Sequence, residues 1–217
     1  LQLLEAHLKP GHNFIDGGAN IGWYSLFCSR KVGGNGKVIA VEASPRNIHV
    51  LRNNIELNNL SNVLLLPVAL GASCGELQME GRLLNSGAGT VAGDFGSDPV
   101  EQAFIWSASV KCLTLVELFE QAKIDQCDWM KLDLQGAEPS VLESADALLE
   151  GRRITNMIIE CGSAGLSLTY DRLKQHGFKA GLISGREIVW VGTRDSFQAK
   201  RDYLFTLCPG QFLTCND

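Results

Sequence analysis

Acidic side chains follow apolar runs at several points of this 217-residue sequence. Asp16, Glu42, Asp133 and Glu160 each stand at or near the end of such a run. Apolar runs of this kind are typical of buried parallel strands, whose carboxyl ends meet at one edge of a sheet. Carboxylates there can accept hydrogen bonds from a ribose, bind an ammonium group or take a proton. We therefore expect a ligand site at that edge.

The first acid opens a loop of small residues, Phe-Ile-Asp-Gly-Gly-Ala-Asn-Ile-Gly at 14–22. Gly17, Gly18 and Gly22 let the backbone turn sharply and approach a bound molecule closely. Asn20 tolerates left-handed backbone angles better than other non-glycine residues. The helix expected after the loop offers unpaired N–H groups and a partial positive charge. The pattern predicts a strand–loop–helix joint that holds a ligand.

Two classes of cofactor compete for such a loop. Nicotinamide and flavin folds use Gly-x-Gly-x-x-Gly, because the pyrophosphate lies on the helix N-terminus. No register of this loop fits, since Ala19 or Asn20 stands where the second glycine is needed. An acid at position 16 would repel a pyrophosphate but suits the ammonium group of S-adenosylmethionine, which carries no phosphate. A tight turn without any ligand is the plainer alternative.

Glu42 ends the apolar run 37–41 and lies 20 residues after Gly22. An acid at the end of the second strand can accept two hydrogen bonds from a ribose diol. That role suits any adenosine cofactor, so Glu42 does not decide between S-adenosylmethionine and NAD. The alternative is an ordinary exposed acid.

The elements that position these residues alternate between strands and helices. Strands are expected at 14–15, 37–41, 63–67, 128–134 and 156–160, and helices at 21–31, 44–59, 115–122, from 139 to 149 and at 166–176. This order predicts an α/β fold with a doubly wound, Rossmann-like parallel sheet in a single domain, 1–217. Two further runs, 178–183 and 187–192, predict an antiparallel hairpin at one edge.

Three segments interrupt this rhythm. Residues 1–13 begin with a helix, and residues 71–108 are rich in Gly and Ser. The second segment is either a substrate loop at the rim of the site or a surface β-hairpin. Residues 195–217 show no clear pattern beyond Tyr203-Leu204-Phe205 and are expected to be a partly ordered tail.

In the helix 21–31, Trp23, Leu26 and Phe27 are expected to face the sheet. Trp23 and Tyr24 lie in its first turn, where an aromatic ring can instead face a sulfonium.

The composition sets limits on partners and compartment. A formal net charge of -5 argues against a general binder of nucleic acid or anionic membranes. No apolar run approaches the roughly 20 residues of a membrane span, and no signal-peptide pattern is visible. The seven cysteines form no C-x-x-C pair, so we expect reduced thiols in a cytoplasmic protein without a metal. Because the chain begins at Leu1, we expect a trimmed N-terminus.

Four motifs taken in order resemble the FkbM family of class I S-adenosylmethionine-dependent methyltransferases. They are Phe-Ile-Asp-Gly-Gly-Ala-Asn-Ile-Gly at 14–22, Val-Glu-Ala-Ser-Pro at 41–45, Asn-Asn-Ile-Glu-Leu-Asn at 53–58 and Met-Lys-Leu-Asp-Leu-Gln-Gly-Ala-Glu at 130–138. The resemblance covers about residues 10 to 195. The last motif departs from the family pattern, which commonly has Glu where this chain has Gln135, and this puts a carboxylate role at that position in doubt.

The resemblance implies a seven-stranded sheet in the order 3-2-1-4-5-7-6 with strand 7 antiparallel. It also implies methyl transfer to a hydroxyl of a sugar, glycan, polyketide or related bacterial metabolite. It assigns three parts of the chain to S-adenosylmethionine: the loop with Asp16, Gly17, Gly18, Ala19, Asn20 and Gly22 to the methionine half, Glu42 to the ribose, and Val68 and Ala69 to the adenine. We also expect Ala43 and Asp133 to contact the cofactor.

Methyl transfer to an alcohol needs alignment and gains from a base, which adds about 10²- to 10⁴-fold. Asp133 and Glu138 are the candidates for the base and the group that orients the acceptor, and Lys131 can hold one of them ionised. The alternatives are a cofactor contact only for Asp133 and a structural ion pair for Lys131. A divalent metal held by Asp133, Glu160 and a third oxygen ligand is a minor alternative.

Three functions remain open from the sequence. The favoured one is an O-methyltransferase acting on a small-molecule or glycan hydroxyl. The second is a NAD-dependent oxidoreductase, which the missing Gly-x-Gly-x-x-Gly disfavours. The third is a protein that binds the cofactor through the methyltransferase fold without catalysis.

Overall fold

The computed structural model describes residues 1–82, 89–91, 104–161, 163–185, 187–193 and 201–212. Its main sheet has eight strands in the order β11-β10-β12-β9-β8-β1-β2-β3. The strands are β1 (Asn13–Gly17), β2 (Lys37–Val41), β3 (Val63–Leu66), β8 (Cys127–Leu132), β9 (Ile154–Cys161), β10 (Lys179–Ser184), β11 (Glu187–Val191) and β12 (Arg201–Thr206). From β3 to β9 all neighbours pair in parallel, as the strand–helix alternation predicts.

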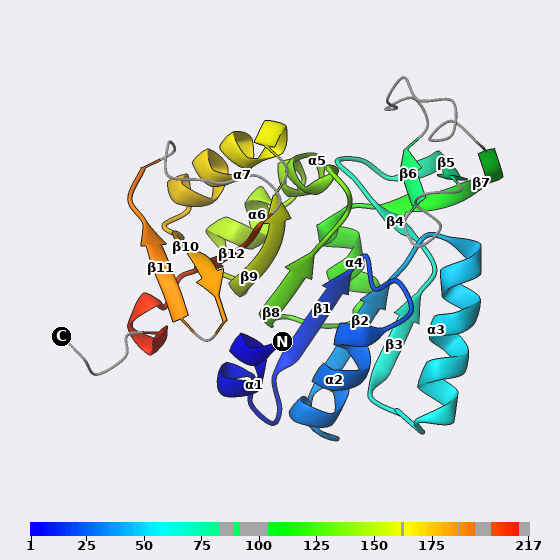
Figure 1. Cartoon of the computed structure of the whole chain (residues 1–217), viewed down its shortest axis with the longest axis horizontal. Coiled ribbons are helices and arrows are strands. Elements are labelled where there is room, and N and C mark those ends of the chain that lie inside the picture. The colour runs from blue at the N-terminus through cyan, green and yellow to red at the C-terminus, as the bar shows by residue number, and fades with distance from the viewer. Residues whose placement is uncertain (83–88, 92–103, 162, 186, 194–200, 213–217) are drawn as a thin grey trace.

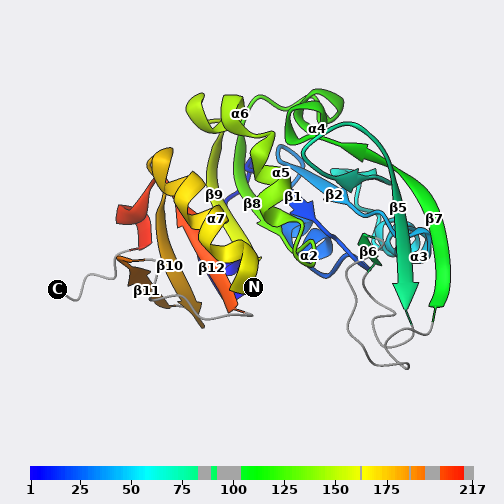
Figure 2. The same ribbon diagram turned by 90° about the horizontal axis from the view of Figure 1, so that it is seen from above.

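Helices cover both faces of this sheet (Figure 1), and Figure 2 shows the two layers from above. One layer holds α1 (Gln2–His7), α2 (Trp23–Val32) and α3 (Pro45–Leu57), and the other holds α4 (Leu115–Ala122), α5 (Glu138–Glu143), α6 (Asp146–Glu150) and α7 (Ser163–Gln175). A single 3₁₀ turn, η2 (Pro209–Phe212), follows β12. Where one helix was expected from 139 to 149, the structure has two, α5 and α6.

The strands alternate between the two layers because successive side chains point to opposite faces. Phe14, Trp129 and Leu204 pack in the core on the α1–α2 side. Ile15 and Met130, one residue further along their strands, pack in the core under α4–α7. The same alternation determines which face of the sheet is occupied by the residues at the carboxyl end of each strand.

A second sheet lies beyond the carboxyl end of the main one and continues from β3 (Figure 1). It consists of β4 (Ala69–Leu70), β7 (Phe104–Leu113), β5 (Gly75–Arg82) and β6 (Gly89–Val91), in that order. Strands β5 and β7 pair antiparallel, so the segment 71–108 contains the β-hairpin that was one of its two expected forms. Residues 83–88 and 92–103 of that segment lie outside the described residues.

The expected tail was wrong in its central part. Strand β12 lies inside the sheet, antiparallel to both β9 and β10, and Tyr203, Leu204 and Phe205 are buried. The hairpin of β10 and β11 does form, but β12 occupies the place expected for strand 7, and β11 is an eighth strand at the edge. The apolar triplet 203–205 is buried on both faces, which makes this segment a central strand.

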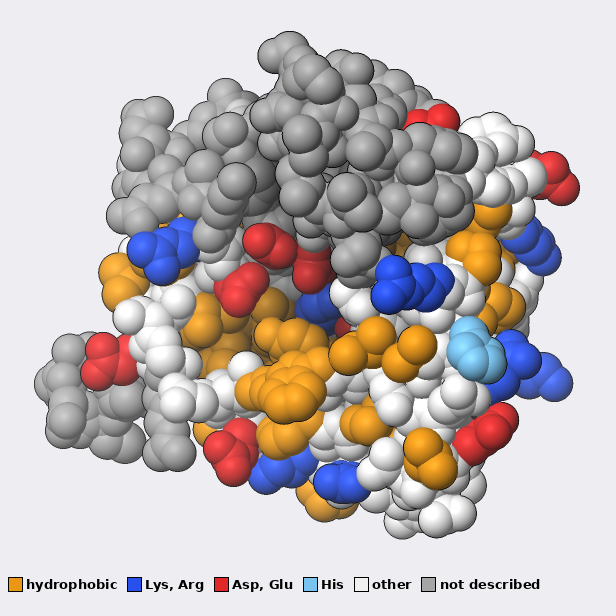
Figure 3. Space-filling view, turned by 45° about the vertical axis from the view of Figure 1, so that its right-hand side comes forward, with side chains coloured by type: hydrophobic (Ala, Val, Ile, Leu, Met, Phe, Trp, Pro, Cys, Tyr) orange, Lys and Arg blue, Asp and Glu red, His pale blue; other side chains and the backbone are white. Residues whose placement is uncertain are grey.

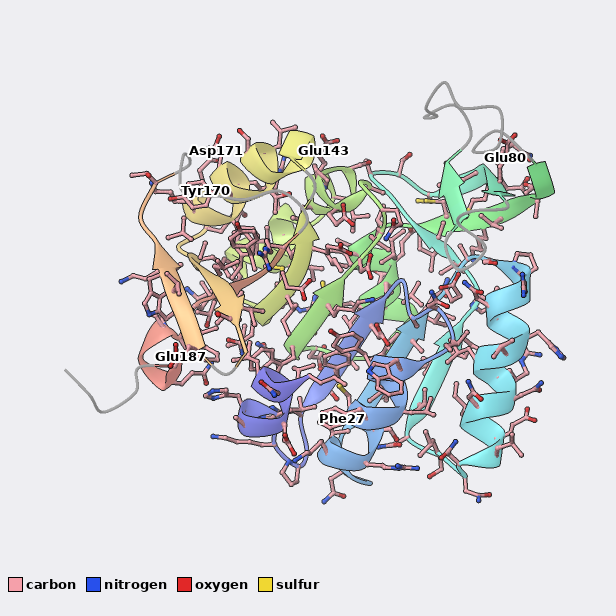
Figure 4. The ribbon with its side chains drawn as sticks, viewed as in Figure 1. Phe27, Glu80, Glu143, Tyr170, Asp171 and Glu187 are labelled. Carbon is pink, nitrogen blue, oxygen red and sulfur yellow. The ribbon has the colours of Figure 1, made fainter. Side chains whose placement is uncertain are left out.

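The expected sheet face of α2 was wrong at Trp23, whereas Phe27 does pack against the core on that side. Trp23 is 70% exposed, and the buried positions are Ser25, Cys28, Ser29 and Val32. Small residues let the helix approach the sheet closely, and their hydroxyls find partners there. Phe27, labelled in Figure 4, lies half-buried on the same helix.

Candidate functional site

The glycine loop between β1 and α2 has the backbone that the sequence predicts. Gly18 has φ +74°, Gly22 has φ +96° and Asn20 has φ +53°. A Cβ on Gly18 would lie 2.1 Å from the carbonyl oxygen of Asp133, so the loop rests directly on the chain beyond β8. A side chain at position 18 would separate the two segments that build the site.

Glu42 binds this loop from the end of β2. Its Oε2 accepts the N–H of Asn20 at 2.7 Å, and its Oε1 accepts the N–H groups of Ala43 at 3.1 Å and Ser44 at 2.8 Å. Burial raises the pKa of the Glu42 carboxyl, and these hydrogen bonds oppose the shift. The backbone thus fixes the carboxylate before any ligand arrives.

Asp16 lies under the loop and is fully buried. Its Oδ2 accepts the hydroxyl of Ser25 at 2.6 Å, which ties β1 to α2. Its Oδ1 lies 3.5 Å from Lys131 Nζ but has no hydrogen-bond partner. A buried carboxylate oxygen in this state can accept a hydrogen bond from a cationic ligand.

Lys131 on β8 joins the glycine loop to Asp133. Its Nζ donates to the carbonyl of Gly18 at 2.9 Å and lies 3.6 Å from Asp133 Oδ2. The ammonium also lies 5.4 Å from the centre of the Tyr24 ring, which packs against it from α2. Lys131 and Asp133 share a face of β8, as strand alternation predicts.

The turn after β8 is held by Glu138, the first residue of α5. Its Oε1 accepts the N–H of Leu134 at 2.5 Å and its Oε2 accepts the N–H of Gly136 at 3.0 Å. Burial is the main cause that raises the pKa of this carboxyl. Both oxygens of Glu138 therefore bind the turn rather than face an open space.

Gln135 lies in the same turn with φ +56°, an uncommon angle for a residue with a side chain. Its Nε2 donates to Asp133 Oδ1 at 2.8 Å. A carboxylate at this position would have no proton to donate at neutral pH. The departure of Gln135 from the family pattern thus gives Asp133 a hydrogen-bond donor.

Three carboxyl groups meet at this edge, from three neighbouring strands. Asp133 follows β8, Glu160 lies near the end of β9, and Asp202 near the start of β12 is the register partner of Glu160. Leu132 and Ile159 are register partners in β8 and β9, so Asp133 and Glu160, each one residue further along, lie side by side at the ends of these strands. Figure 3 shows acidic side chains gathered at a hollow in this side of the molecule, beside a group of hydrophobic ones.

The electrostatics of this group follow from its crowding. Burial, together with the hydrogen bond to Asp133 and its charge, raises the pKa of Glu160 to about 7. Burial and the charge of Asp133 also raise the pKa of Asp202. Burial, with the charges of Asp202, Asp16 and Asp133, raises the pKa of Tyr24 to about 12, so its phenol stays protonated.

A pocket opens between the glycine loop, the ends of β2 and β3 and the turn after β8. Its lining residues are Gly18, Asn20, Val41, Glu42, Ala43, Val68, Ala69, Leu70, Leu77, Met79, Asp133, Leu134, Gln135 and Ala137. The lining joins apolar walls to two carboxylates and holds no Lys or Arg among the residues described. Such a pocket suits an adenosine without phosphate, because a pyrophosphate would face only negative charge.

The expected cofactor residues divide into two groups. Gly18, Asn20, Glu42, Ala43, Val68, Ala69 and Asp133 line the pocket. Asp16, Gly17, Ala19 and Gly22 do not line it, and they build and support the loop instead. Of the expected catalytic residues, Lys131 and Asp133 lie together, whereas Glu138 binds the turn.

Several residues of this region were not predicted from the sequence. Asp202 was assigned to the tail, although its alternation with Leu204 along the strand was the signal that places it on this face. Leu77 and Met79 reach the pocket from the hairpin strand β5, which no local pattern indicates. Ser25 was overlooked because small polar residues rarely mark a packed face.

Two negative findings apply to the residues that the structure describes. No group of three or more His, Cys, Asp or Glu side chains is arranged to hold a metal ion in the described ranges. Within those same ranges, the helices are too short or too polar to cross a membrane.

Solved structures define the class of fold. A methyltransferase FkbM from Methylobacillus flagellatus KT matches with a TM-score of 0.58 and 16% identity, covering 89% of this chain and 43% of that one. A precorrin-6y C5,15-methyltransferase from Geobacter metallireducens GS-15 matches with a TM-score of 0.53 and 13% identity, covering 94% and 84%. The fold is that of the class I methyltransferases, as expected.

Sequence comparison identifies the family. Residues 16–180 match the methyltransferase FkbM domain. "Methyltransferase sdnD" of Sordaria araneosa is 30% identical over 164 residues, which span 65% of this chain and 63% of that protein. The chain thus belongs to the FkbM methyltransferase family and matches less than two thirds of the length of this relative.

Proposed function

We propose that this chain binds S-adenosylmethionine and transfers its methyl group to a hydroxyl of a sugar, glycan or polyketide-type metabolite. The observation that carries the first part is the pocket with Glu42 fixed at one wall and no cation in its described lining. Family membership supports the reaction class. When bound, the cofactor supplies an activated methyl group on a sulfonium.

In this assignment, each part of the pocket has a physical reason to hold one part of the cofactor. Glu42 accepts hydrogen bonds from the ribose, and Val68, Ala69, Leu77 and Met79 offer apolar surface to the adenine. The unpartnered Asp16 Oδ1 and the charge of Asp133 favour the cationic methionine end.

The acceptor enters on the side of the three carboxyl groups rather than through the adenosine pocket. In the part of the chain that the structure describes, Asp133, Glu160 and Asp202 outnumber the cationic side chain beside them, Lys131, whose ammonium is also paired with Asp16. An acceptor that brings phosphate, sulfate or carboxylate to this point would be repelled. A neutral or cationic alcohol meets no such penalty, which agrees with an uncharged sugar or polyketide hydroxyl.

A cytoplasmic location belongs to the same proposal. Cys28, Cys74, Cys112, Cys127 and Cys208 are free thiols. Free thiols persist where the compartment is reducing.

Thermal unfolding with S-adenosylmethionine, S-adenosylhomocysteine and NADH in parallel tests the cofactor. A ligand at about 100 times its dissociation constant stabilises by about 2.7 kcal/mol, which raises Tm by several degrees. We expect this shift from the two sulfur ligands and none from NADH. A shift with NADH alone would overturn the proposal, and binding without methyl transfer to any alcohol would indicate a protein that only binds the cofactor.

A further inference from the structure

The group of Asp133, Glu160 and Asp202 is more than a set of cofactor contacts. Asp133 lines the pocket, and Glu160 lies next to it in the register of β8 and β9. Glu160 and Asp202 do not line that pocket in the part of the chain that the structure describes. They therefore lie beyond Asp133 as seen from the pocket, on the side where we place the acceptor.

The sheet register brings Glu160 and Asp202 together. In an antiparallel pair, residues directly opposite project on the same face with their Cβ atoms close. Like charges in such a position destabilise the pair, so the arrangement lowers stability unless one group holds a proton. Strand alternation places both residues on the α2 side, with Ile158 and Leu204 of the core there.

The charges that face Glu160 are predominantly negative. Asp133 and Glu138 approach from the end of β8 and the start of α5, and Asp202 from β12. Among the described residues, the cations that act on this group are Lys131, whose ammonium lies near Asp133 and Asp16, and the N-terminal ammonium, which acts on Asp202. The phenol of Tyr24 on α2, which feels the charges of Asp133 and Asp202, is uncharged.

Asp133 and Glu160 differ in how they are held. Asp133 accepts the Gln135 amide on Oδ1 and faces the Lys131 ammonium with Oδ2. Glu160 faces carboxyl groups, so its ionised form is disfavoured. A carboxyl group whose pKa is raised toward neutrality is a better proton acceptor near neutral pH than an ordinary one.

We propose that Asp133 and Glu160 form a carboxyl–carboxylate pair in which Glu160 takes the proton of the acceptor hydroxyl, and that Asp202 tunes this pair. The inference rests on the proposed function. Asp16 Oδ1 lies beside the pair, because it is 3.5 Å from the same Lys131, and it accepts no hydrogen bond, so it is a further buried acceptor next to this group.

The reaction balances with this assignment. A new bond forms between the acceptor oxygen and the methyl carbon, and the carbon–sulfur bond breaks with its electron pair left on sulfur as a neutral thioether. The hydroxyl proton moves to the ionised Glu160 and later to solvent. Activity therefore rises as the pH increases through the midpoint of the pair, because the base has to be ionised.

Titration of the Glu160 carboxyl by NMR tests the pair without an acceptor. Protein labelled with ¹³C at the glutamate carboxyls is titrated from about pH 4 to about pH 9, and the Glu160 signal is identified by its loss in Glu160→Gln. We expect a midpoint near neutral pH that moves lower in Asp202→Asn. Glu187→Gln is the matched control, since Glu187 is exposed on the edge strand β11 (Figure 4) and should leave the midpoint unchanged.

A midpoint at the ordinary value of about 4.3, or one that Asp202→Asn leaves in place, would overturn the inference. Binding of S-adenosylhomocysteine to the same samples, measured by calorimetry, keeps the two proposals apart. If the wild-type protein does not bind S-adenosylhomocysteine, the proposed function is refuted. The carboxyl titration by itself tests whether Asp133 and Glu160 form the proposed pair.

The catalytic role is tested with [methyl-³H]S-adenosylmethionine and methyl glucoside or cyclohexane-1,2-diol as neutral probes. Glu160→Gln should lower kcat by about 10²- to 10⁴-fold and leave the affinity for S-adenosylhomocysteine unchanged. Asp202→Asn should move the rising limb of the pH profile to lower pH. A Glu160→Gln protein with wild-type kcat on these probes would contradict the role of Glu160.

Discussion

Two sets of carboxylates lie along one sheet edge, and they are held in opposite ways. Glu42 and Glu138 each accept backbone N–H groups, so the chain itself satisfies them. Asp133, Glu160 and Asp202 face one another across β8, β9 and β12. This difference is the basis of the two roles that we propose: the first set shapes the loops around the pocket, and the second set takes part in proton transfer.

Lys131 links Asp133 of the second set to the glycine loop that Glu42 binds, and its removal should have the largest effect. In Lys131→Met, the fully buried Asp16 loses its cation and an uncompensated charge remains, at a cost of about 3–5 kcal/mol. Chemical denaturation at neutral pH measures this loss. Adding Asp16→Asn to the variant should recover most of the stability, and a Lys131→Met protein as stable as wild type would show that the pair contributes nothing.

Gly18 lies in the loop that Glu42 binds and packs against the backbone of Asp133, and its replacement should have the next largest effect. In Gly18→Ala the new Cβ meets the Asp133 carbonyl oxygen, in addition to the strain of a left-handed angle, which costs about 1 kcal/mol by itself. Gly11→Ala is the control, since Gly11 has φ +84° but nothing within 4 Å. Denaturation should show a greater loss at position 18, and equal losses would mean that the loop does not rest on Asp133.

Glu160→Gln should stabilise the protein at alkaline pH. The pKa of Glu160 is raised to about 7 in the folded protein, so folding favours the protonated carboxyl. The stability that this contributes is fully present below the pKa of the unfolded chain and is lost as the pH rises through about 7. A neutral amide removes this dependence. We expect Tm to be higher in the variant by about 2–4 °C at about pH 8, equivalent to about 1 kcal/mol, with no difference near pH 4. The same Tm difference at both pH values would contradict this.

Gln135→Glu should give the smallest effect on stability. The variant loses the amide donor to Asp133 Oδ1 and places a further carboxylate beside the pair. The turn itself should persist, because Glu138 still binds it. We expect the NMR midpoint of Glu160 to move higher while the affinity for S-adenosylhomocysteine changes by less than about tenfold, or 1.4 kcal/mol. A midpoint that moves lower would mean that Gln135 does not act through Asp133.

Much of the frame could be predicted because its signals are local. The loop 14–22, the acid at the end of β2 and the start of α3 at Ser44-Pro45 each depend on a few adjacent residues. Strand alternation likewise placed Lys131 and Asp133 on one face of β8.

The rest depends on contacts between distant segments. Whether the strand at 201–206 pairs between β9 and β10 is decided by tertiary packing, and Asp202 meets Glu160 only through that pairing. The same holds for Glu138, whose spacing from Asp133 indicated chemistry but whose oxygens bind the turn. Acids at strand ends look alike in sequence, and their hydrogen-bond partners distinguish them.

The division of the carboxylates at this sheet edge into two sets is tested most directly by calorimetry, which measures the binding of S-adenosylhomocysteine to the variants Glu42→Ala and Glu160→Gln. Hydrogen bonds to a charged group are each worth about 1.5–3 kcal/mol, so Glu42→Ala should weaken binding by about 10- to 100-fold. Glu160→Gln should bind as the wild-type protein does. Equal losses in both variants would contradict the division of this edge into a cofactor set and a proton-transfer set.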